Sequence, residues 1–445
     1  MKRAMGLVLF LLIIGMTAFA CAEDAETFTS GNYTYTLNED GSAVISDYSG
    51  RDKELTIPSE LDGHPVKGIG ERAFSHCFNL ISVTIPDGVT SIGGEAFSSC
   101  TSLNSVTIPD SVTDLEANQW AYCINLNTIS VSPGHPALAV IDGALYSKAD
   151  KRLIWVPMST KGTFEIPQGI RIIGYRAFYY CNSLTSVTIP DSVTTIGDSA
   201  FYFCVSLTSV TIPDSVTTIG NSAFYSCYSL TSITIPNSVT TIGDAAFSNC
   251  KSLTSVTIPD SVTFIGDWAF FSCESLISVT IPDSMTSIGR WAFSSCKNLT
   301  SVTILDSVTT IGDSAFYSCE SLTSVTIPDS VTTIGDGAFF DCKSLTSVTI
   351  LDGVTVIGSR AFSSCESLTS VTIPNSVTVI GDSAFSFCVS LTSVTIPDSV
   401  TAIGDSAFSD GPSMIIVTEG SFAEQYCIDN NLPYQCTNYL DWLND

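Results

Sequence analysis

A single stretch decides the fold: Leu184-Thr-Ser-Val187-Thr-Ile189-Pro190-Asp191-Ser-Val193-Thr-Thr-Ile196-Gly197-Asp198-Ser-Ala200-Phe201-Tyr-Phe-Cys204. It recurs with small changes along most of the 445 residues, and a cysteine marks every 23rd position from Cys181 to Cys388. Cys77, Cys100 and Cys123 keep the same step upstream. A fixed period in the twenties predicts a solenoid, in which each repeat buries its apolar side only against its neighbours.

Within one copy, the apolar residues follow the pattern of a short strand and a return. Val187 and Ile189 alternate with polar residues, which predicts a strand with both side chains pointing inward. Pro190 ends the strand because it cannot donate a hydrogen bond to the neighbouring rung. Asp198 is expected to cap the turn that brings Phe201 back to the core. Stacked at about 4.8 Å, some 15 such rungs would make a rod of about 70 Å.

The repeat resembles the BspA-type leucine-rich repeat family. The resemblance rests on Leu-x-x-Val-x-Ile-Pro, Val-x-x-Ile-Gly and Ala-Phe-x-x-Cys as they stand at 184–204, and it covers residues 51–412. It implies a right-handed leucine-rich-repeat solenoid of 23-residue rungs, each a β-strand plus a short turn or helix. The family consists of exported, often surface-bound proteins implicated in adhesion to host proteins and other cells, so the resemblance implies an extracellular binding scaffold without naming its ligand.

The N-terminus has the features of an export signal. Its basic start precedes an apolar run over 6–16, which is too short to span a bilayer, and overlapping Ala-x-Ala cleavage sites end at Ala20 and Ala22. Cys21 could instead carry a lipid anchor. The sequence holds no later stretch apolar enough for a transmembrane helix, so we expect a mature protein that is secreted or lies at the cell surface.

The repeat is flanked by segments that would cover its open ends. A hairpin over 28–50, with strands near 33–37 and 43–45, would cover the first rung, and a helix over 421–430 with Ser421 as its N-cap would cover the last. The predicted divisions are a signal peptide (1–22), an N-terminal cap hairpin (23–50), a solenoid (51–412) with an irregular, hairpin-bearing rung at about 124–178, and a C-terminal helical cap (413–445).

The charge balance excludes several classes of partner. The formal net charge is −27, with only 17 Lys and Arg, whereas nucleic acid and anionic lipid require clustered basic residues. Self-repulsion predicts a soluble monomer, and a cationic partner is the alternative. The three histidines lie in or near irregular rungs, and the chain has no G-x-S-x-G, H-E-x-x-H or phosphate-loop motif. We therefore expect a protein without enzymatic activity, cofactor or metal.

Several columns of identical residues have a structural interpretation. The thirteen column cysteines are odd in number, have apolar neighbours and lack a histidine column, which favours buried free thiols over disulfides or zinc. A disulfide between Cys427 and Cys436 remains open. The aspartate columns favour turn chemistry over Ca²⁺, because Asn221 and others substitute within them. The residue after each cysteine alternates in sign from Lys251 to Glu366, which predicts a surface ion-pair ladder.

Variation is concentrated beside the cysteines, whereas the outward threonine column that includes Thr188 hardly changes. Clustered exposed aromatic residues mark binding surfaces, so a host or neighbouring-cell protein or glycoprotein is the expected partner. The alternative is that these rings pack over the turns of a purely structural surface or matrix protein. The candidate ligand-binding residues are Tyr179, Tyr180, Tyr202, Phe203, Tyr225, Tyr228, Trp268 and Trp291.

Overall fold

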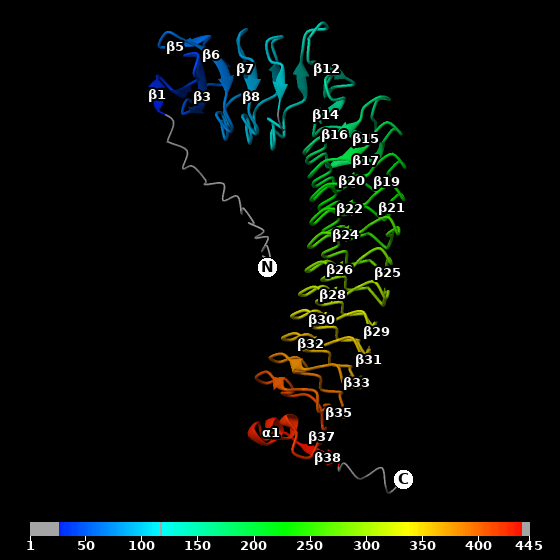
Figure 1. Ribbon diagram of the computed structural model, residues 1–445. Coiled ribbons are helices and arrows are strands. Elements are labelled where there is room, and N and C mark those ends of the chain that lie inside the picture. The colour runs from blue at the N-terminus through cyan, green and yellow to red at the C-terminus, as the bar shows by residue number, and fades with distance from the viewer. Residues whose placement is uncertain (1–25, 116–117, 438–445) are drawn as a thin grey trace, which may run out of the picture.

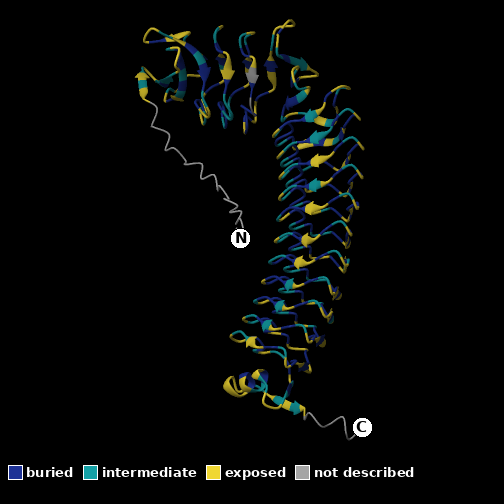
Figure 2. Cartoon of the chain, viewed as in Figure 1, coloured by how far each residue is buried: buried dark blue, intermediate teal, exposed yellow. Residues whose placement is uncertain are grey.

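The structure, a computed structural model, describes residues 26–115 and 118–437. The predicted export signal over 1–22 and the candidate lipid site at Cys21 lie outside the described residues. The chain forms a β-solenoid whose rungs stack along two directions, a short N-terminal stack and a longer C-terminal one (Figure 1). Buried residues line the inside of both stacks in the part of the chain that the structure describes (Figure 2).

Each rung contributes one strand to each of two parallel ladders. In the copy quoted above, β17 (Ser183–Thr188) pairs with β19 (Ser209–Thr211), and β18 (Thr195–Ile196) pairs with β20 (Thr218–Ile219). Val187 lies opposite Val210, so one turn of the solenoid is 23 residues. The chain closes each rung through a turn between the glycine and the cysteine, and we call the side made by these turns (198–203 and its equivalents in other rungs) the turn face.

The first ladder holds the strands with the Val-x-Ile pattern. In chain order these are β4 (Glu54–Thr56), β7 (Ser82–Thr84), β9 (Ser105–Thr107), β11 (Thr128–Ser130), β15 (Lys161–Glu165), β17, β19, β21 (Ser232–Thr234), β23 (Ser255–Thr257), β25 (Ser278–Ile281), β27 (Ser301–Ile304), β29 (Ser324–Ile327), β31 (Ser347–Ile350), β33 (Ser370–Thr372), β35 (Val394–Thr395), β37 (Ile415–Thr418) and β38 (Tyr434–Thr437).

The second ladder holds mostly two-residue strands that end in isoleucine or leucine. They are β6 (His64–Ile69), β8 (Ser91–Ile92), β10 (Asp114–Leu115), β14 (Arg152–Trp155), β16 (Ile172–Ile173), β18, β20, β22 (Thr241–Ile242), β24 (Phe264–Ile265), β26 (Ser287–Ile288), β28 (Thr310–Ile311), β30 (Thr333–Ile334), β32 (Val356–Ile357), β34 (Val379–Ile380) and β36 (Ala402–Ile403).

Both ends of the solenoid are covered. Strands β1 (Thr27–Ser30), β2 (Tyr33–Leu37) and β3 (Ala43–Tyr48) form an antiparallel meander, and β3 pairs in parallel with β6, which is flanked by the short β5 (Glu60–Leu61). Helix α1 (Phe422–Asp429) closes the other end, and the predicted Ser421 cap accepts a hydrogen bond from the Glu424 amide at 3.1 Å. Tyr426 of this helix lies against Phe408 and accepts a hydrogen bond from the amide of Ala407.

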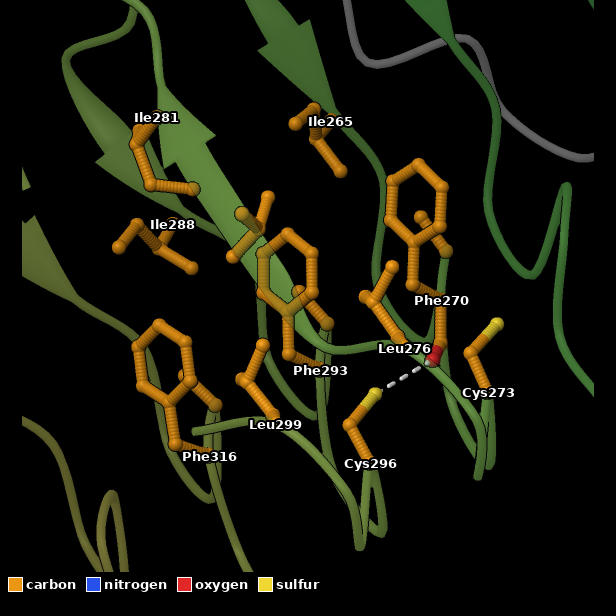
Figure 3. Close-up of a cluster of buried hydrophobic side chains, with 14 of the residues drawn as sticks. Ile265, Phe270, Cys273, Leu276, Ile281, Ile288, Phe293, Cys296, Leu299 and Phe316 are labelled. Carbon is orange, nitrogen blue, oxygen red and sulfur yellow. Dashed lines mark hydrogen bonds between the residues drawn. The ribbon is translucent and has the colours of Figure 1, made fainter. Parts of the chain in front are cut away.

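The core is a set of stacked columns with one residue from each rung. The rings that close the rungs stack from Phe178 to Phe408 with centroids 4.7 to 5.5 Å apart, and Figure 3 shows Phe270, Phe293 and Phe316 in this column. Beside them, the cysteines from Cys204 to Cys388 each donate to the carbonyl of the phenylalanine 26 residues earlier, as Cys296 does to Phe270 at 3.3 Å (Figure 3). The fifteen cysteines of the described chain are all free, Cys427 and Cys436 included. The column cysteines from Cys100 to Cys388 are buried, as predicted, but Cys77 is only half-buried.

Side-chain ladders on the surface repeat the 23-residue step. Asp198 was expected to cap its own turn, but its Oδ1 accepts the backbone N–H of Asn221 in the next rung at 2.7 Å, and Asn221 repeats this contact with Asp244. An amide oxygen accepts as well as a carboxylate, which is why Asn can replace Asp here. Among the described residues no group of three or more His, Cys, Asp or Glu side chains is placed to hold a metal ion.

The predicted charge ladder forms only in part. Lys251 pairs with Glu274 at 2.9 Å and Lys297 with Glu320 at 3.5 Å, but Lys343 turns to Asp341 of its own turn. The charges after the cysteines are therefore coupled two by two, and not as a continuous column. Exposed pairs of this kind contribute little to stability, so register depends on the backbone and on the core.

The prediction of a single rod was wrong, because the lengthened rung separates two stacks. Its hairpin forms as expected, with β13 (Ala144–Ser147) antiparallel to both β14 and β12 (Leu138–Ile141). The second ladder of the N-terminal stack ends at β10. The hairpin begins a new sheet, which continues into the C-terminal stack because β14 pairs in parallel with β16. The apolar interior divides here into two clusters, from Tyr35 to Trp155 and from Ala144 to Cys427. We call this junction the elbow (Figure 1).

Replacing a ring in the phenylalanine column should be costly. Phe270 is fully buried between Phe247 and Phe293, and neighbours held in a fixed register cannot collapse into the space that its ring leaves. We expect Phe270→Ala to lower the free energy of unfolding by about 3–5 kcal/mol, measured by chemical denaturation. The adjacent Phe271→Ala, on the turn face, is the control and should change it far less. Equal midpoints for the two variants would contradict the inward placement of Phe270.

Stability should fall steeply at alkaline pH. Burial raises the pKa of the Cys296 thiol from its ordinary value of 9.0 to about 12, and it also raises the pKa of the other column thiols from Cys181 to Cys388. A raised folded-state pKa gives stability that is complete below the unfolded pKa, near 9.0, and is lost as the pH rises towards 12. Melting temperature against pH should show this loss, and thiol labelling of the native protein should stay low until then. Rapid native labelling of the column would contradict it.

Candidate functional site: the aromatic turn face

The aromatic candidates lie on the turn face, at positions with an unusual backbone. The residue just before each cysteine has a left-handed conformation, with φ of 57° at Tyr180 and 58° at Phe203. The same position holds Ser226 and Asn249 in later rungs, which are short polar residues. Large side chains are disfavoured in this region of φ, so backbone preference does not account for the two rings.

The rings form two parallel columns near the elbow. Tyr179, Tyr202 and Tyr225 stack in one column, with centroids 5.3 and 4.8 Å apart. Tyr180 and Phe203 stack in the other at 4.8 Å, with their planes 2° apart. The columns touch, because the Tyr180 centroid lies 4.7 Å from that of Tyr179.

Burial separates the members of the predicted site. Tyr179 was expected to be exposed, but it is only 2% exposed, because the rings of Tyr122, Tyr180 and Tyr202 and the Arg176 guanidinium pack around it. Tyr180, Tyr202, Phe203 and Tyr225 are half-buried. Tyr228 is exposed and meets the edge of Phe203 at 6.1 Å. Tyr179 therefore supports the surface from below and does not present its own face to solvent.

One member was missed by the sequence analysis. Tyr122 is exposed, and its ring meets Tyr179 edge-on at 5.0 Å and Tyr180 at 5.5 Å. It stands immediately before Cys123, the same position relative to cysteine as Tyr180 and Phe203, which is the signal that would have identified it. It also joins the two stacks, since it belongs to the last rung before the insertion. We call the exposed and half-buried set the elbow patch: Tyr122, Tyr180, Tyr202, Phe203, Tyr225 and Tyr228.

Charged side chains fix the edge of this patch. Glu95 of the N-terminal stack pairs with Arg176 of the C-terminal stack and with Arg72 at 2.9 Å. Burial would raise the pKa of Glu95, but hydrogen bonds and charges from the two arginines outweigh it and hold that pKa below its ordinary value. The Arg176 guanidinium also lies 4.9 Å from the Tyr179 ring centroid, a cation–π distance. The patch is therefore held rigid across the elbow.

The two tryptophans lie further along the same face. Trp268 is 44% exposed, and among the described residues no other aromatic ring pairs with it. Trp291 is half-buried and packs at 5.3 Å against Tyr317, which stacks on Phe340. Six of the eight candidates thus lie together near the elbow, whereas Trp268 is isolated and Trp291 packs with a ring outside the candidate set. Such rings can bind apolar, sugar or cationic surfaces and donate phenolic hydrogen bonds.

Removing the central carboxylate should weaken the elbow. We expect Glu95→Gln to lower the stability of the N-terminal stack by about 1.5–3 kcal/mol, the usual range for hydrogen bonds to charged groups. Because the pKa of Glu95 is depressed, its contribution should be present above its ordinary pKa of 4.5 and be lost as the pH falls through the lower folded-state value. Hydrogen exchange at neutral and acid pH would measure both. Glu71→Gln is the control, because Glu71 is exposed and its carboxylate lies at the longer distance of 3.9 Å from Arg72. An equal loss of stability in this variant would contradict the central role of Glu95.

Comparisons with known proteins agree with this architecture. The family profile described as "BspA type Leucine rich repeat region" matches in six copies, over residues 51–148, 159–275, 217–346 and 286–415. A leucine-rich repeat protein from Bacteroides ovatus is 30% identical over 92% of this chain and 99% of its own, with a TM-score of 0.59. A leucine rich cell surface protein from Faecalibacterium prausnitzii is also 30% identical, over 91% of this chain and 98% of its own, with a TM-score of 0.42. Among curated proteins, none matches.

Proposed function

Since the chain belongs to the BspA-type leucine-rich repeat family, we propose that it is an exported, non-enzymatic scaffold that binds a protein or glycoprotein on a host or neighbouring cell, through the elbow patch. The observation that carries the proposal is the mutual contact of six aromatic side chains on adjoining rungs at the elbow, whereas the rings at Trp268 and at Trp291, Tyr317 and Phe340 lie singly or in a smaller set. Location outside the cell rests on the predicted export signal. No helix in the described part of the chain is long and apolar enough to cross a membrane.

The chemistry of the patch suits a large, rigid partner surface. Its rings are locked by stacking, so they lose little conformational freedom on binding, and tyrosine offers an apolar face with a hydroxyl at its edge. Two cations border the rings: Arg176, which is paired with Glu95, and Lys251, which is paired with Glu274 and lies 6.0 Å from the Tyr228 ring. These features are typical of the aromatic and arginine-rich centre of a protein interface.

One observation favours the rival, a structural surface or matrix protein without a specific ligand. Tyr179 is buried and the rings above it stack on one another, as side chains do when they stabilise a turn. A structural role predicts that loss of the rings lowers stability and leaves cell binding unchanged. A binding role predicts the reverse, so one set of variants separates the two.

The test exchanges elbow rings for the serine that other rungs carry at the same positions. The fourfold variant Tyr180→Ser, Tyr202→Ser, Phe203→Ser and Tyr225→Ser should keep the circular dichroism spectrum. Its binding to immobilised host glycoproteins or to intact neighbouring cells should fall to a small fraction of that of the unmodified mature protein. A few aromatic residues at the centre of an interface carry most of its binding energy.

Two control sets complete this test. Thr188→Ser, Thr211→Ser and Thr257→Ser alter the uniform strand face and should leave binding unchanged, whereas Tyr179→Ser should destabilise the fold because its ring is buried. Loss of binding with the threonine set alone would place the site on the strand face. Unchanged binding with the elbow set would refute the proposal.

A further inference from the structure

A second surface on the turn face forms a hollow between two large side chains. At the left-handed position two residues after the glycine that ends each second-ladder strand, successive rungs carry Trp291, Ser314, Gly337 and Arg360, with φ of 57°, 54°, 61° and 57°. The small residues between the tryptophan and the arginine leave a space of about 390 Å³. The hollow thus has the Trp291 ring at one end and the Arg360 guanidinium at the other. Gly337 lies between them and has no side chain to fill the space.

The side walls differ in chemistry. One wall is the stacked pair Tyr317 and Phe340, whose centroids are 4.9 Å apart and whose edges adjoin the hollow. The other holds Asp336 and Asp382, each of which uses Oδ1 to accept a backbone N–H of the next rung. The second oxygen of each carboxylate has no partner in the part of the chain that the structure describes. Both oxygens are therefore free to accept hydrogen bonds from a ligand.

The charges narrow the class of ligand. Arg360 is exposed and forms no ion pair with any described residue, so a cation in the hollow would meet an uncompensated guanidinium. An anion would meet two carboxylates on a chain of net charge −27. A neutral ligand with many hydroxyls avoids both costs, because hydroxyls donate to carboxylates and accept from a guanidinium. An apolar face would pack on Trp291, as sites that combine aromatic rings with a few polar groups require.

A pyranose ring combines these properties, and we propose that this hollow binds a neutral sugar residue of a glycan. The sugar face packs on Trp291, its hydroxyls donate to Asp336 and Asp382, and Arg360 donates to its oxygens. The inference rests on the proposed function in one respect, because both proposals require that the turn face binds a ligand. It uses none of the side chains of the elbow patch, so the two can fail separately.

The chain provides matched variants for the test. Trp291→Ser installs the residue found at 314 and removes the aromatic end, and Arg360→Ser removes the guanidinium. Gly337→Trp fills the hollow with a residue that the backbone accepts at this position in two other rungs, at Trp268 and Trp291. Trp268→Ser is the control, because it removes an exposed tryptophan outside the hollow.

The probes are lactose, maltotriose and N-acetylchitotriose, titrated into the mature protein by calorimetry, with sialyllactose and trilysine as charged comparators. We expect at least one neutral probe to bind, Trp291→Ser and Gly337→Trp each to weaken it roughly thirtyfold or more, and Trp268→Ser to leave it unchanged. No binding of any neutral probe, binding that survives both variants, or tighter hollow-dependent binding of a charged probe would each overturn the inference. Sugar binding that persists in the fourfold elbow variant supports it as a separate site.

Discussion

Every feature of this protein depends on one constraint: each rung must offer its hydrogen-bonding groups to the next rung at a step of 23 residues. Val187 opposes Val210 in the strand ladder, Asp198 accepts from Asn221 on the turn face, and Cys204 donates to Phe178 in the core. Because backbone and side chains share one step, an inserted residue would break several ladders at once. The sequence therefore keeps the period without a gap from Cys181 to Cys388.

The elbow shows what happens where the step is not kept. The extra residues before Cys181 replace one rung interface with a hairpin, and the stack resumes in a new direction (Figure 1). The junction is imperfectly satisfied, since Gln119 Oε1 and Trp120 Nε1 are buried without a partner among the described residues. Polar contacts across it offset part of this cost, among them the hydrogen bond from Asn118 to the Arg176 carbonyl at 3.0 Å and the Glu95 ion pairs. Buried polar groups without partners cost free energy, and such local costs are typical of sites where the geometry of a protein has a function.

The sequence predicts the rungs well because their period is a local signal repeated many times. It predicts the hairpin of the lengthened rung, but not the change of direction, which depends on how the apolar interior divides. Trp155 packs with Trp120 in the N-terminal cluster, whereas Leu153 of the same strand belongs to the C-terminal one. At the candidate site the same limit applies to neighbouring rings: Tyr179 and Tyr180 look equivalent in sequence, and Tyr179 is buried because Tyr122, from across the insertion, and Arg176 pack against its ring.

The three sides of the solenoid differ in how much freedom the ladders leave them. On the two strand sides, hydroxyls such as Thr208 and Ser215 bond to carbonyls of the preceding rung, so replacing one of them breaks a contact between two rungs. On the turn face, the ladder fixes the Asp or Asn and the backbone conformation, but not the side chains at the left-handed positions. Those positions hold Ser in most rungs and large rings in a few. Selection for a partner can act there without loss of the fold, which is why both proposed surfaces lie on this side.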